Sequence, residues 1–382
     1  MHKVEPMAPT SPSLSVETQA DPLHQDEIRV KFASDDLFLK VLRQRVDQMF
    51  ETTGRRRRDC LQMYLKTAVI FGWFAVSYGF LVFWAANWWQ ATLLAISLGG
   101  SLACIGFAIQ HDGSHCAYSR RRWVNNLMAI SLDLIGGSSY YWQKTHNTVH
   151  HTFTNITGHD GDIDLGILGR LSPHQPRMGF HRLQHLYLWV LYGLVSIKWQ
   201  LFDDFHSFFS GKNGRFKIAR PKGWNLVVFV VGKLSFVTIA FVIPMLTHQW
   251  LPVLVFFLVA SFIQGLLLSV VFQLAHCVEE ADFPVPDSDA EMENAWAVHQ
   301  VATTVNFATR NRLITWFTGS LNHQVEHHLF PKISHVNYPA ISVVVEQTCG
   351  ELGVKYSSHQ TLRSSLWSHF RWLKKMGRPA VD

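Results

Sequence analysis

The chain has 382 residues, of which 48% are hydrophobic and 13% aromatic, while only 16% are charged. Soluble domains carry about 25% charged residues, so this composition favours a membrane protein over two soluble domains. The formal net charge is +6, and the basic residues gather between apolar stretches, as in a protein that grips an anionic membrane face. No nucleic-acid-binding motif accompanies this charge, so no nucleic-acid partner is predicted.

The chain begins with a polar segment. Residues 1–25 are rich in Pro and Ser and lack the apolar core of a signal peptide, so we predict a disordered tail. A helix is predicted from residue 35 to about residue 50, because Phe38, Leu42 and Met49 follow helical spacing. The five cysteines form no CxxC pair and indicate reduced packing residues.

Four apolar stretches are each close to the ~20 residues that cross a bilayer. They form two hairpins, because only the short Trp-bearing turns 87–90 and 247–250 divide the members of each pair. Lys233 is an anomaly inside the third stretch, where it would snorkel or face protein. The predicted spans cover about residues 64–86, 91–110, 224–246 and 251–275.

The basic residues outside the hairpins set the predicted orientation. Arg55–Arg58, Arg120–Arg122 and Lys217–Lys222 all flank the spans, whereas both hairpin turns lack Lys and Arg. The positive-inside rule therefore places both termini and the middle segment in the cytoplasm. We expect a multi-pass integral membrane protein.

The remaining segments suggest shorter helices. Leu127–Trp142 and Leu186–Trp199 are predicted as helices lying in the membrane interface, and Ser364–Arg378 as a basic amphipathic helix. The predicted fold class is therefore an all-α integral membrane protein, with a cytoplasmic helical cap below two hairpins. One membrane domain is expected over residues 26–355, followed by a basic amphipathic tail over residues 356–382.

Three histidine clusters lie just beyond the hairpins on the predicted cytoplasmic side. In each cluster two histidines stand four residues apart, which on a helix puts both imidazoles on one face. The second and third clusters add an adjacent histidine that points about a quarter-turn away and can reach a second metal ion. The clusters are His111 and His115; His146, His150 and His151; and His323, His327 and His328.

Several histidines outside these clusters are weaker candidates for metal ligands. On spacing alone, His276 at the end of the fourth span is more often structural than a ligand. His181 and His185 also stand four apart, but they lack a third member and are expected at the surface. His159, His299 and His335 are expected to form hydrogen bonds. The third cluster fits the H-x-x-E-H zinc-protease pattern, which would leave the other two clusters unexplained.

This donor set suits a redox metal centre. Imidazole is a ligand for Fe, Zn or Cu, and eight or nine neutral imidazoles would leave two ferrous ions with positions free for dioxygen. Nearby carboxylates can orient ring N–H groups and offset charge. The acidic run after the second cluster could equally be a solvated turn. The polar residues in question are Asp112, Asp160, Asp162, Asp164 and Glu326, with Asn147 and Asn322 inside the cluster motifs.

With these residues in view, the chain resembles the membrane fatty acid desaturase family over roughly residues 35–355. The clusters HDGSH, HNTVHHTFTN and NHQVEHHLFP are similar to its three histidine boxes. The segments GHDGDIDL and FQLAH also resemble sequences of this family. The resemblance implies that the box histidines bind two irons and that His276 completes the set. No catalytic residue beyond the metal centre is implied.

The residues of the third box make the resemblance more specific. Gln324 before Val325-Glu326-His327-His328 is similar to front-end desaturases, which insert a cis double bond between an existing one and the carboxyl end. Many of these carry a fused cytochrome b5-like domain with an HPGG motif, and none occurs here. The resemblance is therefore to bacterial and cyanobacterial delta-6 enzymes acting on acyl-lipid or linoleoyl-CoA substrates. It implies a separate electron donor, such as a ferredoxin or a cytochrome.

The implied reaction uses dioxygen, two electrons and two protons to remove two hydrogens from an acyl chain. Tyr140, Tyr141 and Trp142 could line the acyl channel, although ordinary interfacial aromatics explain them equally well. The nearest rival is a hydroxylase, ketolase or epoxygenase on the same scaffold. A haem electron carrier would place facing histidines inside the spans, and a metal-ion transporter would place polar residues there. Neither pattern fits.

Overall fold

The computed structural model describes residues 30–213 and 216–379. Helices dominate this part of the chain, and its strands are two-residue pairs, so the predicted all-α class is confirmed. The polar tail predicted over residues 1–25 lies outside the described residues. The pairs are β1 (Lys31–Phe32) with β4 (Glu291–Met292), β2 (Lys212–Asn213) with β3 (Phe216–Lys217), and β5 (Asn306–Phe307) with β6 (Ser358–His359).

Four helices are long and apolar enough to cross a membrane, as predicted. The second and fourth run further than expected, so that their ends carry His111 and His276 into the cap. The first is α2 (Leu61–Phe83), and the second joins α3 (Trp88–Cys104), the π-helix η1 (Ile105–Gln110) and α4 (His111–Ser114). The third joins α11 (Trp224–Val237), the π-helix η7 (Thr238–Val242) and α12 (Ile243–Met245), and the fourth is α13 (Trp250–His276).

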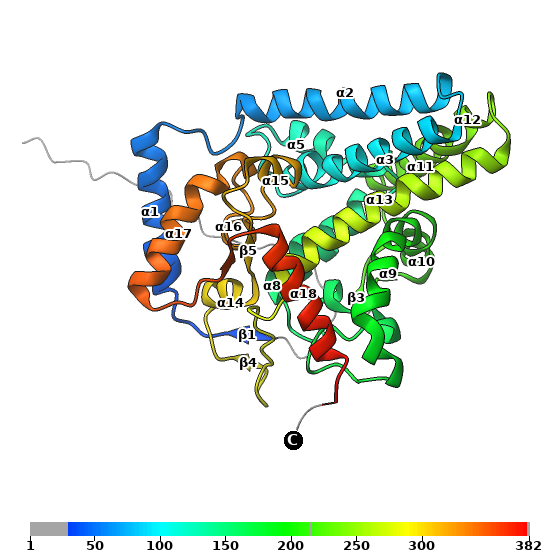
Figure 1. Cartoon of the computed structure of the whole chain (residues 1–382). Coiled ribbons are helices and arrows are strands. Elements are labelled where there is room, and N and C mark those ends of the chain that lie inside the picture. Colours follow the sequence, from blue (N-terminus) through cyan, green and yellow to red (C-terminus); the bar gives the residue numbers. More distant parts are fainter. Residues whose placement is uncertain (1–29, 214–215, 380–382) are drawn as a thin grey trace, which may run out of the picture.

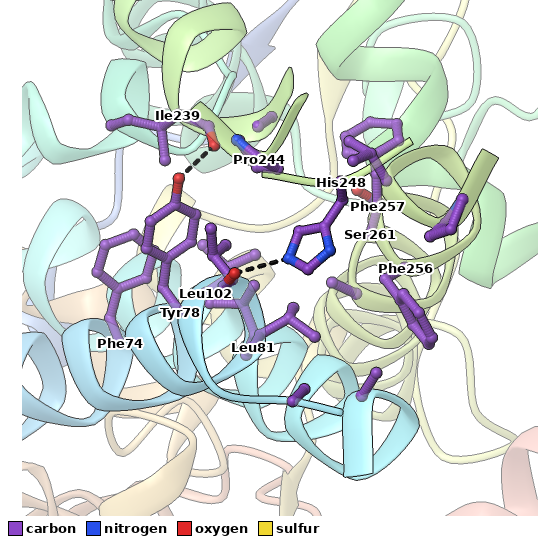
Figure 2. Close-up of a pocket in the computed structure, with 18 of the residues that line it drawn as sticks. Phe74, Tyr78, Leu81, Leu102, Ile239, Pro244, His248, Phe256, Phe257 and Ser261 are labelled. Atoms are coloured by element: carbon purple, nitrogen blue, oxygen red, sulfur yellow. Dashed lines mark hydrogen bonds between the residues drawn. The ribbon is translucent and has the colours of Figure 1, made fainter. Parts of the chain in front are cut away.

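The two hairpins are arranged as predicted. Their turns lie together at the upper right of Figure 1, far from the cap at the left. His248 in the second turn donates from Nε2 to the carbonyl of Val82 near the end of α2, at 2.7 Å (Figure 2). Small residues bring the helix backbones together further in. A Cβ on Gly99 of α3 would lie 2.5 Å from the carbonyl oxygen of Ala260 on α13, so only glycine allows this approach.

The middle segment differs from its prediction. The continuous helix expected over 127–142 is wrong, because the Gly136-Gly137 turn interrupts it and Gly136 takes a φ of +98° that suits glycine. Three short helices stand there: α5 (Arg122–Ala129), α6 (Ser131–Leu134) and α7 (Ser139–Trp142). The helix expected over 186–199 is present as α9 (Gln184–Lys198), which continues through the π-helix η6 (Trp199–Asp203) into α10 (Asp204–Ser210).

Lys233, the anomalous charge in the third span, faces protein. Its Nζ donates to Asp204 Oδ2 at 2.7 Å and to the carbonyl of Gly136 at 2.6 Å, and its side chain is 10% exposed. A buried lysine is tolerated when a carboxylate and hydrogen bonds compensate for its lost hydration. The pair therefore ties the Gly136 turn to α11 and α10.

The cap packs the N-terminal helix α1 (Leu37–Thr53) against α17 (Tyr338–Leu352), and α1 confirms the helix predicted near residues 35–50. Leu42 and Val46 are fully buried in this core. The C-terminal amphipathic helix is present as α18 (Leu362–Met376), and its Trp372 and Leu373 pack on the protein. Smaller elements complete the cap: α8 (His151–Phe153), α14 (Trp296–Thr303), α15 (Arg312–Phe317), α16 (Gln324–Leu329) and the 3-10 helices η3 (Gly161–Ile163), η4 (Gly166–Leu168), η5 (Gly179–Leu183) and η8 (His335–Asn337).

Candidate metal centre

The three histidine clusters converge where the second and fourth spans enter the cap. Eight of the nine predicted ligands come together there, and each is at most 7% exposed. They are supplied by five different segments of the chain, so only the complete fold assembles them. These eight are His111 and His115 at α4, His146 and His150 in the π-helix η2 (Gln143–His150), His151 in α8, His276 at the end of α13, and His327 and His328 in α16.

One of these segments is a π-helix, and another directly follows one, where the sequence pattern predicted α-helix. The π-helix η1 directly precedes His111, and η2 contains His146 and His150. A π-turn inserts an extra residue into a helix and is frequent at functional sites, because it re-aims the side chains that follow. The four-residue spacing still keeps His146 and His150 together, with ring centroids 5.1 Å apart.

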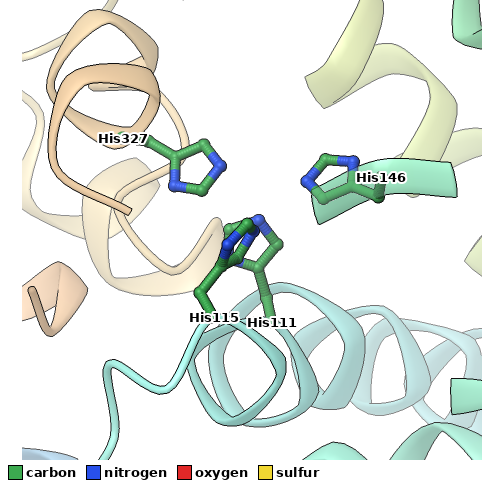
Figure 3. Close-up of side chains that lie close together, drawn as sticks. All are labelled: His111, His115, His146 and His327. Atoms are coloured by element: carbon green, nitrogen blue, oxygen red, sulfur yellow. The ribbon is translucent and has the colours of Figure 1, made fainter. Parts of the chain in front are cut away.

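The rings form two adjacent groups. His111, His115, His146 and His327 each offer one nitrogen, and these four atoms lie within 4.8 Å of one another (Figure 3). His150, His276 and His328 form a second group by the same measure. His151 lies within that distance of His327 and His328 and so connects the two groups.

Several of the nitrogens that face the centre have no protein partner among the described residues. This holds for Nε2 of His115, His146, His150 and His327, and for both ring nitrogens of His151. A buried polar atom without a partner costs about 1–3 kcal/mol, and native proteins rarely accept several at one place. Neutral imidazoles are common ligands of Fe, Zn and Cu, so this donor set fits bound metal.

Three of the outward-facing nitrogens, in contrast, have hydrogen-bond partners. His150 donates from Nδ1 to Asp160 Oδ2 at 3.0 Å, and His328 donates from Nδ1 to Gln300 Oε1 at 2.8 Å. His327 Nδ1 lies 3.3 Å from the hydroxyl of Tyr338. Such partners fix the tautomer and the ring orientation, and they leave Nε2 free to bind a metal.

The electrostatics favour the ligand form of the rings. Burial, assisted by neighbouring imidazoles, lowers the pKa of His146, His151, His327 and His328 well below the usual value. These rings are therefore neutral at pH 7, which metal binding requires. His150 is the exception: burial opposes its charged form, but the adjacent Asp160 outweighs burial and raises the pKa of His150.

His323 stands apart from both groups, and the helical spacing assumed for it is wrong. Helix α16 begins at Gln324, and His323 before it has a non-helical φ of −106° and ψ of 61°. Gln324 instead shares a helix face with His328, and its Nε2 lies 3.0 Å from His276 Nε2 and 3.3 Å from His328 Nε2. The sequence signal for this was the four-residue spacing of Gln324 and His328.

Two of the predicted carboxylates lie at the centre. Asp160 accepts from His150 and from the backbone N–H groups of Asn155 and Asp162, at 2.9 and 3.0 Å. Asp162 Oδ2 lies 3.6 Å from His146 Nδ1 and 3.7 Å from His150 Nδ1. Asp164 is exposed and accepts from Gly166 N in a turn. The acidic run therefore contains both predicted kinds of residue: Asp160 and Asp162 contact histidines, and Asp164 belongs to a solvated turn.

The other predicted polar residues connect segments and do not orient the eight rings. Their contacts tie the histidine-bearing loops to one another and to the cap. Asp112 accepts from Ser334 and from the backbone of His335, Asn147 donates to the carbonyl of Ser114, Asn322 donates to the carbonyl of Phe307, and Glu326 accepts from Asn306 and Tyr356. Burial raises the pKa of Glu326 to about 7.

Several supporting residues were not predicted as such. Gln300 and Tyr338 hold box histidines, and neither lies in a recognisable motif. Lys66 of α2 contacts His335 at 2.9 Å, and His335 in turn contacts Asp112 within the first box. Only the fold brings these segments together, so spacing in the sequence could not reveal them.

The remaining predictions have mixed outcomes. His299 forms a hydrogen bond to the carbonyl of Thr154, as expected of a supporting residue. His181 was expected at the surface, but it is 1% exposed and bonds to the carbonyl of Ile167, so that prediction is wrong. Trp142 stacks on His146 with centroids 4.2 Å apart, and Tyr141 is buried against Phe229.

The structure thus combines four candidate membrane-spanning helices with buried histidine groups that could hold metal. Residues 86–360 match the family model described as fatty acid desaturase, and the chain belongs to that family. It is therefore an enzyme of the oxidoreductase class that acts in lipid metabolism.

Similar proteins extend over nearly the whole chain. The sn-1 linoleoyl-lipid 6-desaturase of Arthrospira platensis is 38% identical over 91% of this chain and 95% of its own length. The enzyme of the same name from Synechocystis is 36% identical over 92% of this chain and 98% of its own. An acyl-lipid (8-3)-desaturase of Physcomitrium patens is 37% identical over 90% of this chain and 72% of its own.

Proposed function

We propose that this protein is a dioxygen-dependent front-end desaturase that inserts a cis double bond into a lipid-linked acyl chain, using two iron ions. The observation that carries the proposal is the pair of histidine groups joined by His151, in which several inward nitrogens, including Nε2 of His146, His150 and His327, have no protein partner among the described residues. Two groups in such proximity suit two ions that act on one substrate. One ion would be bound by His111, His115, His146 and His327. The other would be bound by His150, His276 and His328, and His151 could bind either ion.

The overall reaction is balanced when one acyl –CH2–CH2– unit, dioxygen, two electrons and two protons give –CH=CH– and two waters. Bound iron supplies dioxygen activation and the oxidising power for breaking unactivated C–H bonds. The chain's own residues hold and orient the site. Asp160, Gln300 and Tyr338 fix the ring tautomers, and Trp142 covers His146. Burial of all eight rings limits water access, which protects reactive species from side reactions.

The position of the double bond is proposed from the relatives. Two of them act, by name, as 6-desaturases on the sn-1 linoleoyl chain of a lipid, and both are covered almost completely by this chain. The same regiochemistry and an acyl-lipid substrate are therefore proposed here. An acyl-CoA substrate is the alternative carrier.

Location and electron supply follow from the charge pattern. We expect the site and both termini on the cytoplasmic side of a bacterial inner membrane, since Arg55, Arg57 and Arg120–Arg122 are exposed around the cap. The same basic surface suits an acidic donor protein such as a ferredoxin or a cytochrome, whose approach would be steered electrostatically.

The test is to express the chain in a bacterial host supplied with linoleate, iron and a ferredoxin system, and to analyse lipid acyl chains by mass spectrometry. The expected product is a triene with a new double bond at carbon 6. A hydroxylated or keto product would assign the chain to the hydroxylase or ketolase alternative on the same scaffold. If no modified acyl chain forms while iron is bound, the desaturase proposal is wrong for these substrates.

A further inference from the structure

A cavity of about 240 Å³ lies between the two hairpins, away from the metal centre. All four spans contribute to its wall, and residues of both hairpin turns, Asn87 and His248, line its outer end (Figure 2). Phe74 and Tyr78 come from α2, Leu102 from α3, Ala240 from the third span and Phe256 from α13. None of the eight histidines of the metal centre lines it.

The polar groups in this wall already have partners inside the protein. The Tyr78 hydroxyl donates to the carbonyl of Ile239 at 2.7 Å, and His248 donates to the carbonyl of Val82. At the inner end Gln200 donates to the carbonyl of Ile135 at 3.0 Å and accepts from Ser261, completing a closed polar group. A water molecule in a cavity needs about two to four polar partners, and this wall has little left to offer.

The surroundings of the cavity are hydrocarbon. The spans that enclose it expose apolar side chains on their outer faces, including Phe80, Val231 and Leu258. A dry apolar cavity of about 150 Å³ holds one benzene molecule, so 240 Å³ corresponds to roughly ten carbon atoms. That size fits a segment of one extended acyl chain and is too small for a whole lipid.

The inner end of the cavity is closed toward the metal centre. Leu102 lines this end, and nine residues of helix, about 13 Å, separate it from His111. Ile105, Ile109 and Leu132 fill that interval and are at most 2% exposed. A chain in the cavity therefore lies outside the reacting site.

We propose that this cavity binds one acyl chain of a membrane phospholipid, which inserts between the hairpins from their turns and fastens them together. The two hairpins already converge there, because His248 contacts Val82 of α2 and Gly99 of α3 lies against Ala260 of α13. A chain packed between Tyr78 and Phe256 would add apolar contact to both hairpins. A ligand that binds only the folded protein raises its stability, so the bound chain stabilises the hairpin pair.

The test uses Ala240→Phe, which places a ring in the cavity, with Val231→Phe as the matched control on the lipid-facing side of α11. The full chain is purified in detergent, depleted of lipid, and titrated with 1-palmitoyl-2-oleoyl-phosphatidylcholine while the midpoint of thermal unfolding is measured. We expect a saturable rise for the wild type and Val231→Phe, and a rise at least halved for Ala240→Phe. Mass spectrometry before depletion should find about one fewer phospholipid per chain in Ala240→Phe.

Equal lipid retention and equal rises in all three proteins would overturn the proposal, because the lipid would then act on the outer surface alone. If Ala240→Phe does not fold, Ala91→Leu fills the wall from α3 with a smaller group and carries the same expectation. Loss of the lipid response in Val231→Phe as well as in the filled variant would also contradict a site confined to the cavity.

Discussion

The metal-centre end and the hairpin end of the molecule treat buried polar atoms in opposite ways. At the metal centre the inward ring nitrogens of His115, His146 and His327 have no protein partner. At the hairpin end Tyr78 and His248 are both hydrogen-bonded to backbone carbonyls, and the wall around them is apolar. Buried polar atoms without a hydrogen-bond partner indicate a bound charged ligand. An apolar wall whose polar atoms are already hydrogen-bonded indicates a hydrocarbon ligand. Each end thus specifies the chemistry of its own ligand.

The largest expected effect separates two histidines of the third cluster. His327→Ala removes a nitrogen that faces the centre, so desaturase activity should fall by more than about 100-fold, beyond the 10–100-fold typical of outer partners. His323→Ala should keep activity within about threefold, because His323 lies in neither histidine group. Product yield and bound iron per chain measure both effects.

An equal loss of activity in the two variants would return His323 to the metal centre and reject the proposed ligand set. A folded His327→Ala that keeps full iron and full activity would reject the role of the first group. Size-exclusion profiles and the unfolding midpoint of each variant separate these outcomes from misfolding.

The next effect concerns the hydrogen bond that orients His150. Asp160→Asn keeps the shape of the side chain but weakens the charge-assisted bond to Nδ1, so the affinity for iron should fall about 10- to 100-fold. Asp164→Asn is the matched control, because Asp164 is exposed and accepts from Gly166 N within its own turn. Iron retention during chelator titration distinguishes the two. If both variants lose iron equally, the acidic run acts through net charge and the specific bond is irrelevant.

Sequence alone predicted most of this centre. Apolar length predicted the four spans. The four-residue histidine pairs, together with the adjacent His151 and His328, included seven of the eight gathered rings. His276 required the family resemblance, because a single histidine carries no spacing. His323 lies outside both groups because the chain turns at that residue, where the pattern had assumed a helix. Gln300 and Tyr338 could not be predicted, because they reach the centre only through long-range packing.

The metal centre and the hairpin end are joined by closely packed helices, and substitutions at glycines test this packing. A Cβ on Gly265 of α13 would lie 2.6 Å from the carbonyl oxygen of Gly193 on α9, whereas a Cβ on Gly72 of α2 would meet nothing within 4 Å. Gly265→Ala should therefore lower the free energy of unfolding by about 1–3 kcal/mol through overpacking. Gly72→Ala should leave it unchanged or slightly higher. Thermal unfolding in detergent compares the two, and equal stabilities would show that the α9–α13 contact yields at little cost.

The smallest effect concerns a buried histidine whose two nitrogens are both satisfied. His369 donates from Nδ1 to the carbonyl of Cys277 at 2.6 Å, and the Tyr192 hydroxyl donates to its Nε2 at 3.1 Å. Burial lowers the pKa of His369 to about 4. The folded state therefore favours the neutral ring, and this contribution to stability is complete above pH 6.5 and is lost as the pH falls toward 4.

Between pH 7.5 and pH 5.5 this linkage should lower the free energy of unfolding by about 1 kcal/mol. His369→Gln has no titrating ring, so its unfolding midpoint should fall less than that of the wild type over the same interval. All other histidines titrate alike in both proteins, so the difference isolates His369. Iron content should be unaffected in the variant, because a histidine with two protein partners has no nitrogen left for a metal. An equal fall of the unfolding midpoint in the two proteins would contradict this assignment. Loss of iron from His369→Gln would contradict the distinction between hydrogen-bonded rings and rings with a nitrogen free for metal.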